Sequence, residues 1–260
     1  MPNWVQNWLT VRTQDKHFIM GKDECVDFNT LIPMPKELEN TISGGSIDDC
    51  MAYQYLKTHT KDEFVKSRYF RNNYAGLKKS MTKKAMAEKL LERIGDNPRM
   101  FDSEFFDKGE HNHTPEEVGQ YYLDLVDKFG CYDWYNWHLA NWGCKWNACR
   151  PEIVSEEGGI TCFQFDTPWG CPNEWLDILS EKIPFHLAWE EEQGYRGIVT
   201  SFGNGIETDE DLPMIEWEED EYGDYVQSKD EYGEEWTSLY LDDVFRKGVI
   251  YATTRLEVRA

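Results

Sequence analysis

The sequence predicts an α+β fold in which an antiparallel sheet packs with helices and carries a helical insertion lobe. Two strand-like segments stand near the start, a long stretch of helical periodicity follows, and a strand, helix, strand, strand series comes after it. The composition supports a folded protein, because 260 residues with 40% hydrophobic and 15% aromatic residues can bury a sizeable core.

The first two strands are expected at the start of the chain. Residues from Val5 to Arg12 tend to alternate between apolar and polar side chains, which is typical of a half-buried strand. The run from Cys25 to Leu31 is also β-like. It ends at Pro33 and Pro35, where a ladder would lose its N–H donors.

A helical lobe is expected over residues 39–130. From Ser46 onward apolar residues recur at helical spacing. Thr114 followed by Pro115 is the pattern of an N-cap with proline at the first helical position. Gly130 is placed to end that helix.

A second group of sheet elements is expected after residue 131. The group comprises a strand at 160–165, a helix at 172–182, strands at 185–190 and 195–202 joined by a hairpin, a helix at 236–246 and a strand at 249–258. This series makes up most of a βαββαβ unit, so residues 1–38 and 131–260 are assigned to one sheet domain. Residues 207–235 form an acidic insertion within it.

The densest signal in the sequence is a cluster of indoles between Tyr132 and Ala148. Its signature residues are Trp134, Trp137, Trp142, Gly143 and Trp146. Buried aromatic side chains remove a large area from water, so a cluster of this density is expected to organise a core. The alternative is that the cluster forms a surface that binds a ligand.

This cluster and several flanking motifs resemble the phage- and plasmid-borne proteins named for the YubB ferredoxin-like domain. The matching segments are Met1-Pro2-Asn3-Trp4 with Asn7 and Leu9-Thr10-Val11, Leu31-Ile32-Pro33-Met34-Pro35, Trp134 to Trp137, Asn141 to Ala148, Phe163 to Thr167, Trp169, Pro172, Trp175 and Tyr195-Arg196-Gly197. Val5 and Cys144 stand where the family would have Cys and Thr, which argues against ligand roles for the signature cysteines.

The resemblance covers residues 1–38 and 131 to about 205. It implies a ferredoxin-like βαββαβ topology, which describes a chain path and not an iron-sulfur cluster. It also implies an origin in a phage or another mobile element. It implies no known reaction.

The charge of the chain disfavours two classes of partner. The sequence holds 27 basic and 49 acidic residues, a formal net charge of -22. Direct binding to nucleic-acid phosphates and to anionic membranes relies on cationic contacts, so both are disfavoured.

The sequence is expected to belong to a cytoplasmic protein, in the host cytoplasm if a phage encodes it. No apolar run approaches the roughly 20 residues of a membrane span, and no secretion signal is evident. The seven cysteines are therefore expected to be reduced thiols. The oligomeric state stays open.

Charge is distributed unevenly along the chain. Residues 207–235 contain fourteen acidic residues and one Lys, a local net of -13, whereas residues 61–93 contain ten basic and four acidic residues, a local net of +6. Aromatic residues at intervals in the acidic segment indicate a hairpin with aromatic anchors. We expect partner binding by Glu216, Trp217, Glu218, Glu219, Asp220, Glu221, Tyr222, Asp224, Tyr225, Asp230 and Glu231. Alternatively, the segment docks on the basic lobe.

No motif for catalysis or cofactor binding is found. The sequence has no GxxxxGK(S/T) phosphate loop, no GxSxG elbow, no HExxH and no EF-hand loop. Two sets of residues have metal-ligand chemistry at incomplete spacing, namely Glu110, His111 and His113, and His138, Cys144 and Cys149. We therefore expect no catalytic residue, no metal and no cofactor.

Two functions from different classes follow. The first is a phage or mobile-element accessory protein that binds a host or anti-phage defence protein with a basic surface and inhibits it as an acidic mimic of nucleic acid. The alternative is a small enzyme or nucleic-acid processing factor with its site between the helical lobe and the sheet. The missing catalytic motifs favour the first.

Overall fold

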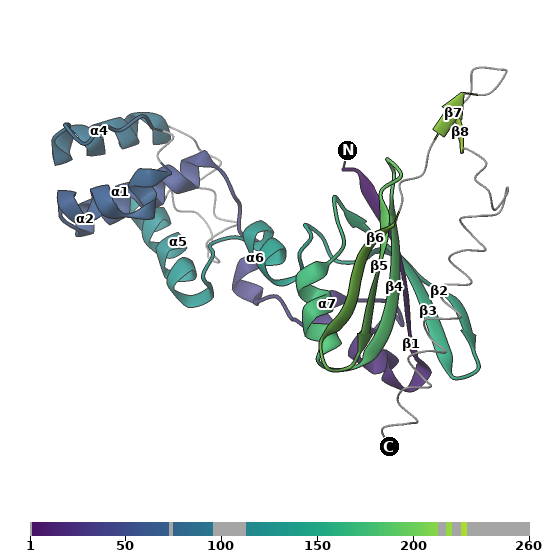
Figure 1. Ribbon diagram of the computed structural model, residues 1–260. Coiled ribbons are helices and arrows are strands. Elements are labelled where there is room, and N and C mark those ends of the chain that lie inside the picture. The colour runs from purple at the N-terminus through teal and green to yellow at the C-terminus, as the bar shows by residue number, and fades with distance from the viewer. Residues whose placement is uncertain (1, 73–74, 96–112, 213–216, 220–224, 228–260) are drawn as a thin grey trace. The chain divides into compact units, whose positions relative to one another are not determined.

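The computed structural model describes residues 2–72, 75–95, 113–212, 217–219 and 225–227 (Figure 1). Contacts between Cα atoms divide the chain into two compact units. One unit, here the sheet unit, comprises Met1–Pro33 and His138–Ala260, and the other, the helical unit, comprises Met34–Trp137. None of the described helices is long and apolar enough to cross a membrane.

The sheet unit is built mainly from strands. Its elements are β1 (Trp4–Arg12), η1 (Thr13–Phe18), η2 (Phe28–Thr30), β2 (Cys149–Glu157), β3 (Ile160–Pro168), α7 (Asn173–Ser180), β4 (Pro184–Glu191), β5 (Arg196–Phe202), β6 (Ile206–Leu212), β7 (Trp217–Glu219) and β8 (Tyr225–Gln227). Six strands form one sheet in the order β2-β3-β1-β4-β5-β6, and β7 pairs with β8. The predicted α+β class with an antiparallel sheet is confirmed.

Strand β1 occupies the centre of the six-stranded sheet. It pairs antiparallel with β3 on one side and with β4 on the other, so β3 and β4 run parallel to each other. Helix α7 connects those two strands. Strands β2 and β6 form the two edges of the sheet (Figure 1).

The core of the sheet unit lies on the face that α7 covers. Leu9 of β1 stands between Phe163 of β3 and Leu187 of β4, and all three side chains are fully buried. Phe28 contacts both Phe165 of β3 and Trp175 of α7, with ring centroids 5.8 Å and 4.8 Å away. Alternation along the strands therefore gives the sheet one apolar face for the helix.

The predicted strand from Cys25 to Leu31 is wrong. Only an isolated bridge joins Met20 to Val26, and residues 28–30 form the 3-10 helix η2. The Phe28 N–H donates to the Asn147 side chain at 2.8 Å, and the Asp27 carboxylate caps the turn. Side chains thus take hydrogen bonds that a strand ladder would have used.

Two strands, β2 and β6, were not expected from the sequence. Most side chains of both strands are exposed, so neither strand shows the alternation that marks a half-buried strand. The expected strands at 160–165, 185–190 and 195–202 and the helix at 172–182 correspond to β3, β4, β5 and α7. The expected helix at 236–246 and strand at 249–258 lie outside the described residues.

The helical unit contains short helices around its own core. Its elements are η3 (Lys36–Leu38), α1 (Gly45–Thr58), α2 (Lys61–Lys66), α3 (Arg68–Arg71), α4 (Lys83–Ile94), α5 (Pro115–Phe129) and α6 (Trp134–Asn141), the last crossing into the sheet unit. The predicted start of α5 is confirmed, since Thr114 forms a capping box with Glu117. Gly130 ends that helix in a left-handed conformation, as predicted.

Candidate functional site

Trp142 of the indole cluster is a core residue. Its side chain is 1% exposed, and its indole N–H donates to the Ile32 carbonyl oxygen at 3.0 Å. The ring stacks on His138 at 3.9 Å and meets Phe28 edge-on at 5.7 Å. The structural interpretation of the cluster therefore applies to this residue. Trp137 is also buried, whereas Trp134 and Trp146 are half-buried.

Gly143 is required where the indole cluster meets the start of α7. Its φ angle of 81° lies in the left-handed region that favours glycine. A Cβ atom at this position would overlap with the Glu174 carboxylate and lie 2.8 Å from the Asn173 backbone nitrogen. The glycine thus permits the close approach between this turn and the helix.

Trp146 belongs to a ladder of aromatic and basic side chains beside the start of β1. The Trp4 and Trp146 ring centroids are 5.8 Å apart. The Lys145 ammonium lies 4.7 Å from the Trp146 ring and 5.2 Å from the Trp169 ring, and the Arg150 guanidinium lies 4.9 Å from the Trp4 ring. Cation–π attraction stabilises this arrangement.

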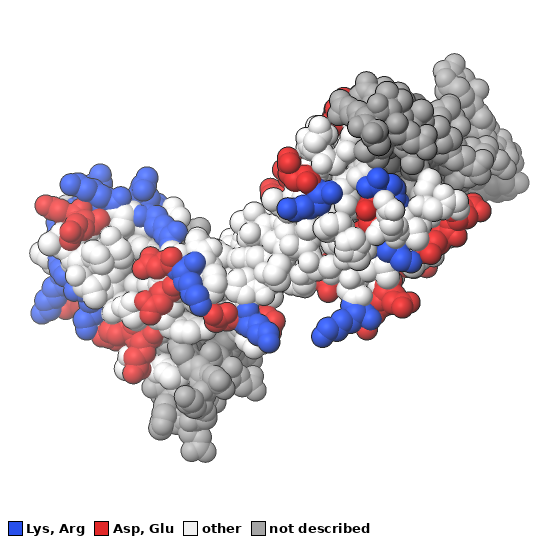
Figure 2. Space-filling view, turned by 90° about the horizontal axis from the view of Figure 1, so that it is seen from below, with Lys and Arg blue, Asp and Glu red and all other residues white. Residues whose placement is uncertain are grey.

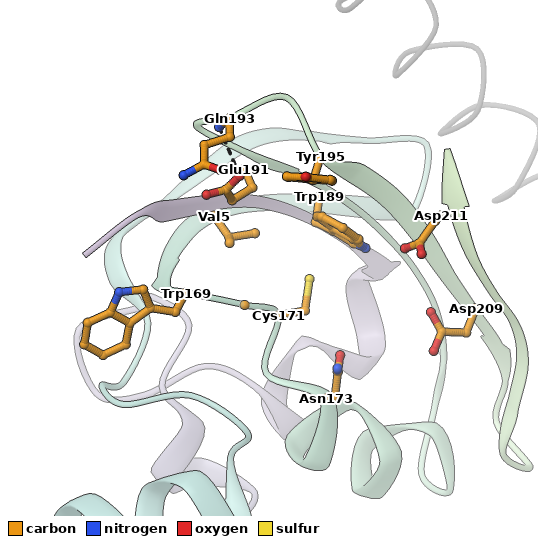
Figure 3. Close-up of a pocket in the computed structure, with 11 residues that line it drawn as sticks. Val5, Trp169, Cys171, Asn173, Trp189, Glu191, Gln193, Tyr195, Asp209 and Asp211 are labelled. Carbon is orange, nitrogen blue, oxygen red and sulfur yellow. Dashed lines mark hydrogen bonds between the residues drawn. The ribbon is translucent and has the colours of Figure 1, made fainter. Parts of the chain in front are cut away.

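A pocket of about 580 Å³ opens beside the start of α7 (Figure 3). We call it the aromatic–acidic pocket; it is lined by Val5, Trp169, Gly170, Cys171, Asn173, Trp189, Glu191, Gln193, Tyr195, Asp209 and Asp211. These residues come from the first strand, the segment between β3 and α7, the first residue of α7, the β4–β5 hairpin and the edge strand β6. Trp169 and Tyr195 are 54% and 56% exposed.

The sheet register explains how an indole and carboxylates share this pocket. Gly197 of β5 pairs with Trp189 on one side and with Asp211 on the other. A Cβ atom on Gly197 would lie 2.8 Å from the Trp189 ring and 2.6 Å from the Glu210 carbonyl oxygen. Without that atom the indole extends over β5 toward Asp211, as Figure 3 shows.

The charged residues that line the aromatic–acidic pocket are all acidic: Glu191, Asp209 and Asp211. Burial raises the pKa of the Cys171 thiol well above its ordinary value, and the negative charges of Asp209 and Asp211 raise that pKa further. The thiol donates to the Asn7 side-chain oxygen at 3.5 Å. A raised thiol pKa together with this hydrogen bond is typical of a buried structural cysteine.

The predicted partner-binding residues lie only partly within the described chain. Trp217, Glu218 and Glu219 form β7 and Tyr225 begins β8, and these two strands pair antiparallel. The others, Glu216, Asp220, Glu221, Tyr222, Asp224, Asp230 and Glu231, lie outside the described residues. The structure therefore brings together only part of the predicted set.

The acidic segment begins in the edge strand β6, within the residues 207–235 that the sequence predicts to be an insertion. Glu207, Asp209, Glu210 and Asp211 are all exposed there. Acids at 207, 209 and 211 have the two-residue period of a strand face, a signal that could have indicated both the strand and the pocket wall. Trp189 and Glu191 show the same spacing in β4.

The candidate metal ligands around the indole cluster bond to the backbone. A ring nitrogen of His138 lies 2.7 Å from the Lys145 carbonyl oxygen, and the thiols of Cys144 and Cys149 donate to carbonyl oxygens. Burial raises the pKa of Cys144 to about 12. Among the described residues no group of three or more His, Cys, Asp or Glu is arranged to hold a metal ion. Glu110 and His111 lie outside the described residues.

Comparison with known proteins adds little to this geometry. No family model matches the chain, and no curated protein matches it. A crystal structure of the protein api92 from Yersinia pseudotuberculosis, described with the family model DUF1281, is 12% identical. The alignment covers 82% of this chain and 99% of that chain, with a TM-score of 0.38. A similarity this weak assigns no fold family and no activity to the chain.

Proposed function

We propose that this chain is a non-catalytic phage or mobile-element protein that binds a basic surface of a host or anti-phage defence protein. It acts in the host cytoplasm, as an acidic mimic of nucleic acid that blocks its partner. The resemblance to the YubB ferredoxin-like proteins supports the origin, and the exposed acidic edge of the sheet supports the mode of binding.

The acidic edge strand β6 is the observation that carries this proposal. Its four carboxylates are exposed, and no Lys or Arg occurs in the sequence between Arg196 and Lys229. An edge with this charge repels another acidic strand and attracts a basic surface. The net charge of -22 also steers a basic partner toward the protein.

Capture from host cells tests the proposal. We expect the full chain to retain a protein with a basic surface, which about 0.5 M salt releases through screening. The E207Q/D209N/E210Q/D211N variant should lose that protein. The matched control E152Q/E157Q/D177N/E181Q removes four exposed carboxylates elsewhere in the sheet unit and should retain it.

Equal retention by the edge variant and by the control would contradict the proposal. Both variants need the melting temperature of the parent protein, because loss of folding would also abolish capture. Exposed carboxylates contribute little to stability, so both should fold.

We also propose that strands β1 to β4 follow a ferredoxin-like path. The order β2-β3-β1-β4 supports it, because β1 lies between two parallel strands that α7 connects. The connection from β1 to β2 runs through the helical unit. An experimental structure that places a helix of this connection beside α7 would support the path, and an uncovered sheet there would contradict it.

The alternative function, nucleic-acid processing, is favoured by one feature of the helical unit. The rings of Tyr55 and His59 stack at 3.8 Å, Tyr69 lies 4.9 Å from Tyr55, and the Arg68 guanidinium lies 5.1 Å from the Tyr69 ring. Aromatic and basic side chains together can bind single-stranded nucleic acid. On the face in Figure 2, however, acidic side chains lie among the basic ones.

Binding of a labelled 20-nucleotide single strand separates the two functions. The interaction protein should show no binding at physiological salt, because its net charge opposes phosphate contact. Binding that weakens with salt and with R68A/Y69A would establish the alternative. The variant K78A/K79A, which removes two exposed charges outside the ring stack, is the control.

A further inference from the structure

We propose that the aromatic–acidic pocket binds the guanidinium group of an arginine side chain. The inference rests on the proposed function, since a basic protein partner supplies the arginine. It assigns to the sheet unit a specific site in addition to a general negative charge. Three observations carry it: the cavity, its exposed aromatic rings and its exclusively acidic charged residues.

The aromatic residues of the pocket suit a planar cation. Tyr195 is largely exposed and Trp189 is half-buried, so both rings are accessible at the β4–β5 hairpin. Guanidinium groups stack on aromatic faces and lose less hydration than ammonium groups. The chain itself places a cation on this aromatic set, because the Lys145 ammonium lies 5.2 Å from the Trp169 ring.

The carboxylates of the pocket suit the donors of the same group. Asp209 and Asp211 are two residues apart on β6, and both carboxylates face the cavity in Figure 3. Neither forms an ion pair with a described Lys or Arg. Arginine presents five N–H donors in a fixed planar fork that matches carboxylate oxygens.

Other ligand classes fit the pocket less well. Phosphate-bearing ligands would meet three carboxylates and no Lys or Arg in the lining. The acidic residues there are not arranged as a metal-binding group. An apolar ligand would leave the carboxylates desolvated without partners. An organic cation with a planar face therefore remains. Guanidinium is the one that stays charged on proteins at neutral pH, since an imidazolium group is mostly deprotonated there.

Titration of the full chain with a blocked peptide, acetyl-Gly-Arg-Gly-amide, tests the site. Indole N–H resonances report the position of binding, and the variant W189F assigns the Trp189 signal. We expect saturable shifts of that signal. The neutral citrulline peptide should bind at least about tenfold more weakly, because a tenfold change corresponds to the loss of one good charge-assisted contact.

Matched variants locate the interaction in the pocket. D209N/D211N should weaken binding about tenfold or more, and Y195S about fivefold, without change in melting temperature. D177N/E181Q removes two exposed carboxylates outside both the pocket and the acidic edge and should change affinity less than about twofold. An equal loss of peptide affinity in this control would show that only the overall negative charge of the protein matters. That result would overturn the proposed site.

Two further results would overturn the proposal. One is the absence of a saturable shift of the Trp189 signal at about 10 mM peptide, an affinity too weak for a specific contact. The other is equal affinity for acetyl-Gly-Lys-Gly-amide, which would show recognition of charge without guanidinium geometry.

The site and the proposed function fail in distinguishable ways. Capture of a basic protein that survives D209N/D211N and Y195S, but is lost in the four-residue edge variant, keeps the function and removes the site. Peptide binding with no captured partner keeps the site and removes the function.

Discussion

At the scale of single residues, burial separates the tryptophans that stabilise the fold from those available for binding. Trp142 lies in the core and has a hydrogen-bond partner for its indole N–H, whereas Trp169 is half exposed. Tryptophan therefore has two different roles in this chain, and only the structure distinguishes them.

Trp142→Ala should lower the free energy of unfolding by about 3–5 kcal/mol, because it removes a buried aromatic side chain and leaves a cavity. Urea unfolding measures the change. Trp169→Ala is the control and should cost about 1 kcal/mol or less, since its side chain is largely exposed. If Trp142→Ala keeps the stability of the parent protein, Trp142 serves in binding and not in the core.

Acid should destabilise the protein through His186. Burial lowers the pKa of His186 to about 4, and a ring nitrogen lies 2.9 Å from the Thr200 hydroxyl. The unfolded chain binds this proton near pH 6.5, so stability is present above that pH and falls as the pH drops toward 4. The loss is about 3 kcal/mol at most.

His186→Gln keeps a neutral hydrogen-bonding group and should flatten this part of the stability profile. Urea unfolding at pH 7.0, 5.5 and 4.5 measures the slope. His17→Gln, at an exposed position, should leave the slope of the parent protein. If the stability of His186→Gln falls with pH as steeply as that of the parent protein, other groups cause the loss of stability in acid.

At the scale of elements, the packing of α7 depends on a turn without a side chain. Gly143→Ala should lower the free energy of unfolding by about 3 kcal/mol or more, because overlap with the start of α7 adds to the cost of a left-handed backbone. Gly158→Ala is a matched control, with a φ angle of 62° and no atom within 4 Å of the added Cβ. It should cost only about 1 kcal/mol. Equal costs for the two would show that α7 adapts to the extra atom.

The segment that contains the paired strands β7 and β8 gives a test of the predicted recognition role. Neutralising Glu218, Glu219, Asp220 and Glu221 to Gln or Asn should leave the melting temperature unchanged, because like charges in such a run repel one another and add nothing to stability. Association with the captured basic partner should slow, and salt should slow association of the parent protein. A lower melting temperature with unchanged association would instead indicate that the segment docks on basic residues of the chain.

The sequence predicts an element well where that element alone determines the pattern of its residues. β1, β3 and β5 alternate in burial over much of their length, and β4 begins with a buried run, so all four strands were visible in the sequence. The cap of α5 was readable from Thr114. The strand expected at 25–31 failed because Asn147, more than a hundred residues away, bonds to it. The pocket was not predictable, because the β4, β5 and β6 registers place Trp189 beside Asp211.

At the scale of the whole molecule, each compact unit has buried residues of its own. In the helical unit Leu56, Phe64, Met86 and Tyr122 are nearly inaccessible to solvent. Its residues also form one continuous stretch of chain. A core within a continuous segment is the usual mark of a part that folds alone.

Residues 34–137 expressed alone should therefore unfold cooperatively on heating, measured by circular dichroism at 222 nm. The variant Tyr122→Ala should abolish or lower that transition, because it removes a buried aromatic side chain. Gln120→Ala, at an exposed position of the same helix, is the control. A gradual, non-cooperative change in the parent segment would show that its core needs the rest of the chain.

The central position of β1 has a consequence for synthesis of the chain. Leu9 of β1 pairs with Phe163 of β3, which lies 154 positions later in the chain (163 − 9). Its other neighbour, β4, follows later still. At about 5–20 residues per second, the ribosome needs roughly 10–30 s to supply the first neighbour. Throughout that interval the strand that becomes the middle of the sheet has two open edges. The nascent chain should therefore recruit chaperones early, and the helical unit can fold during the wait.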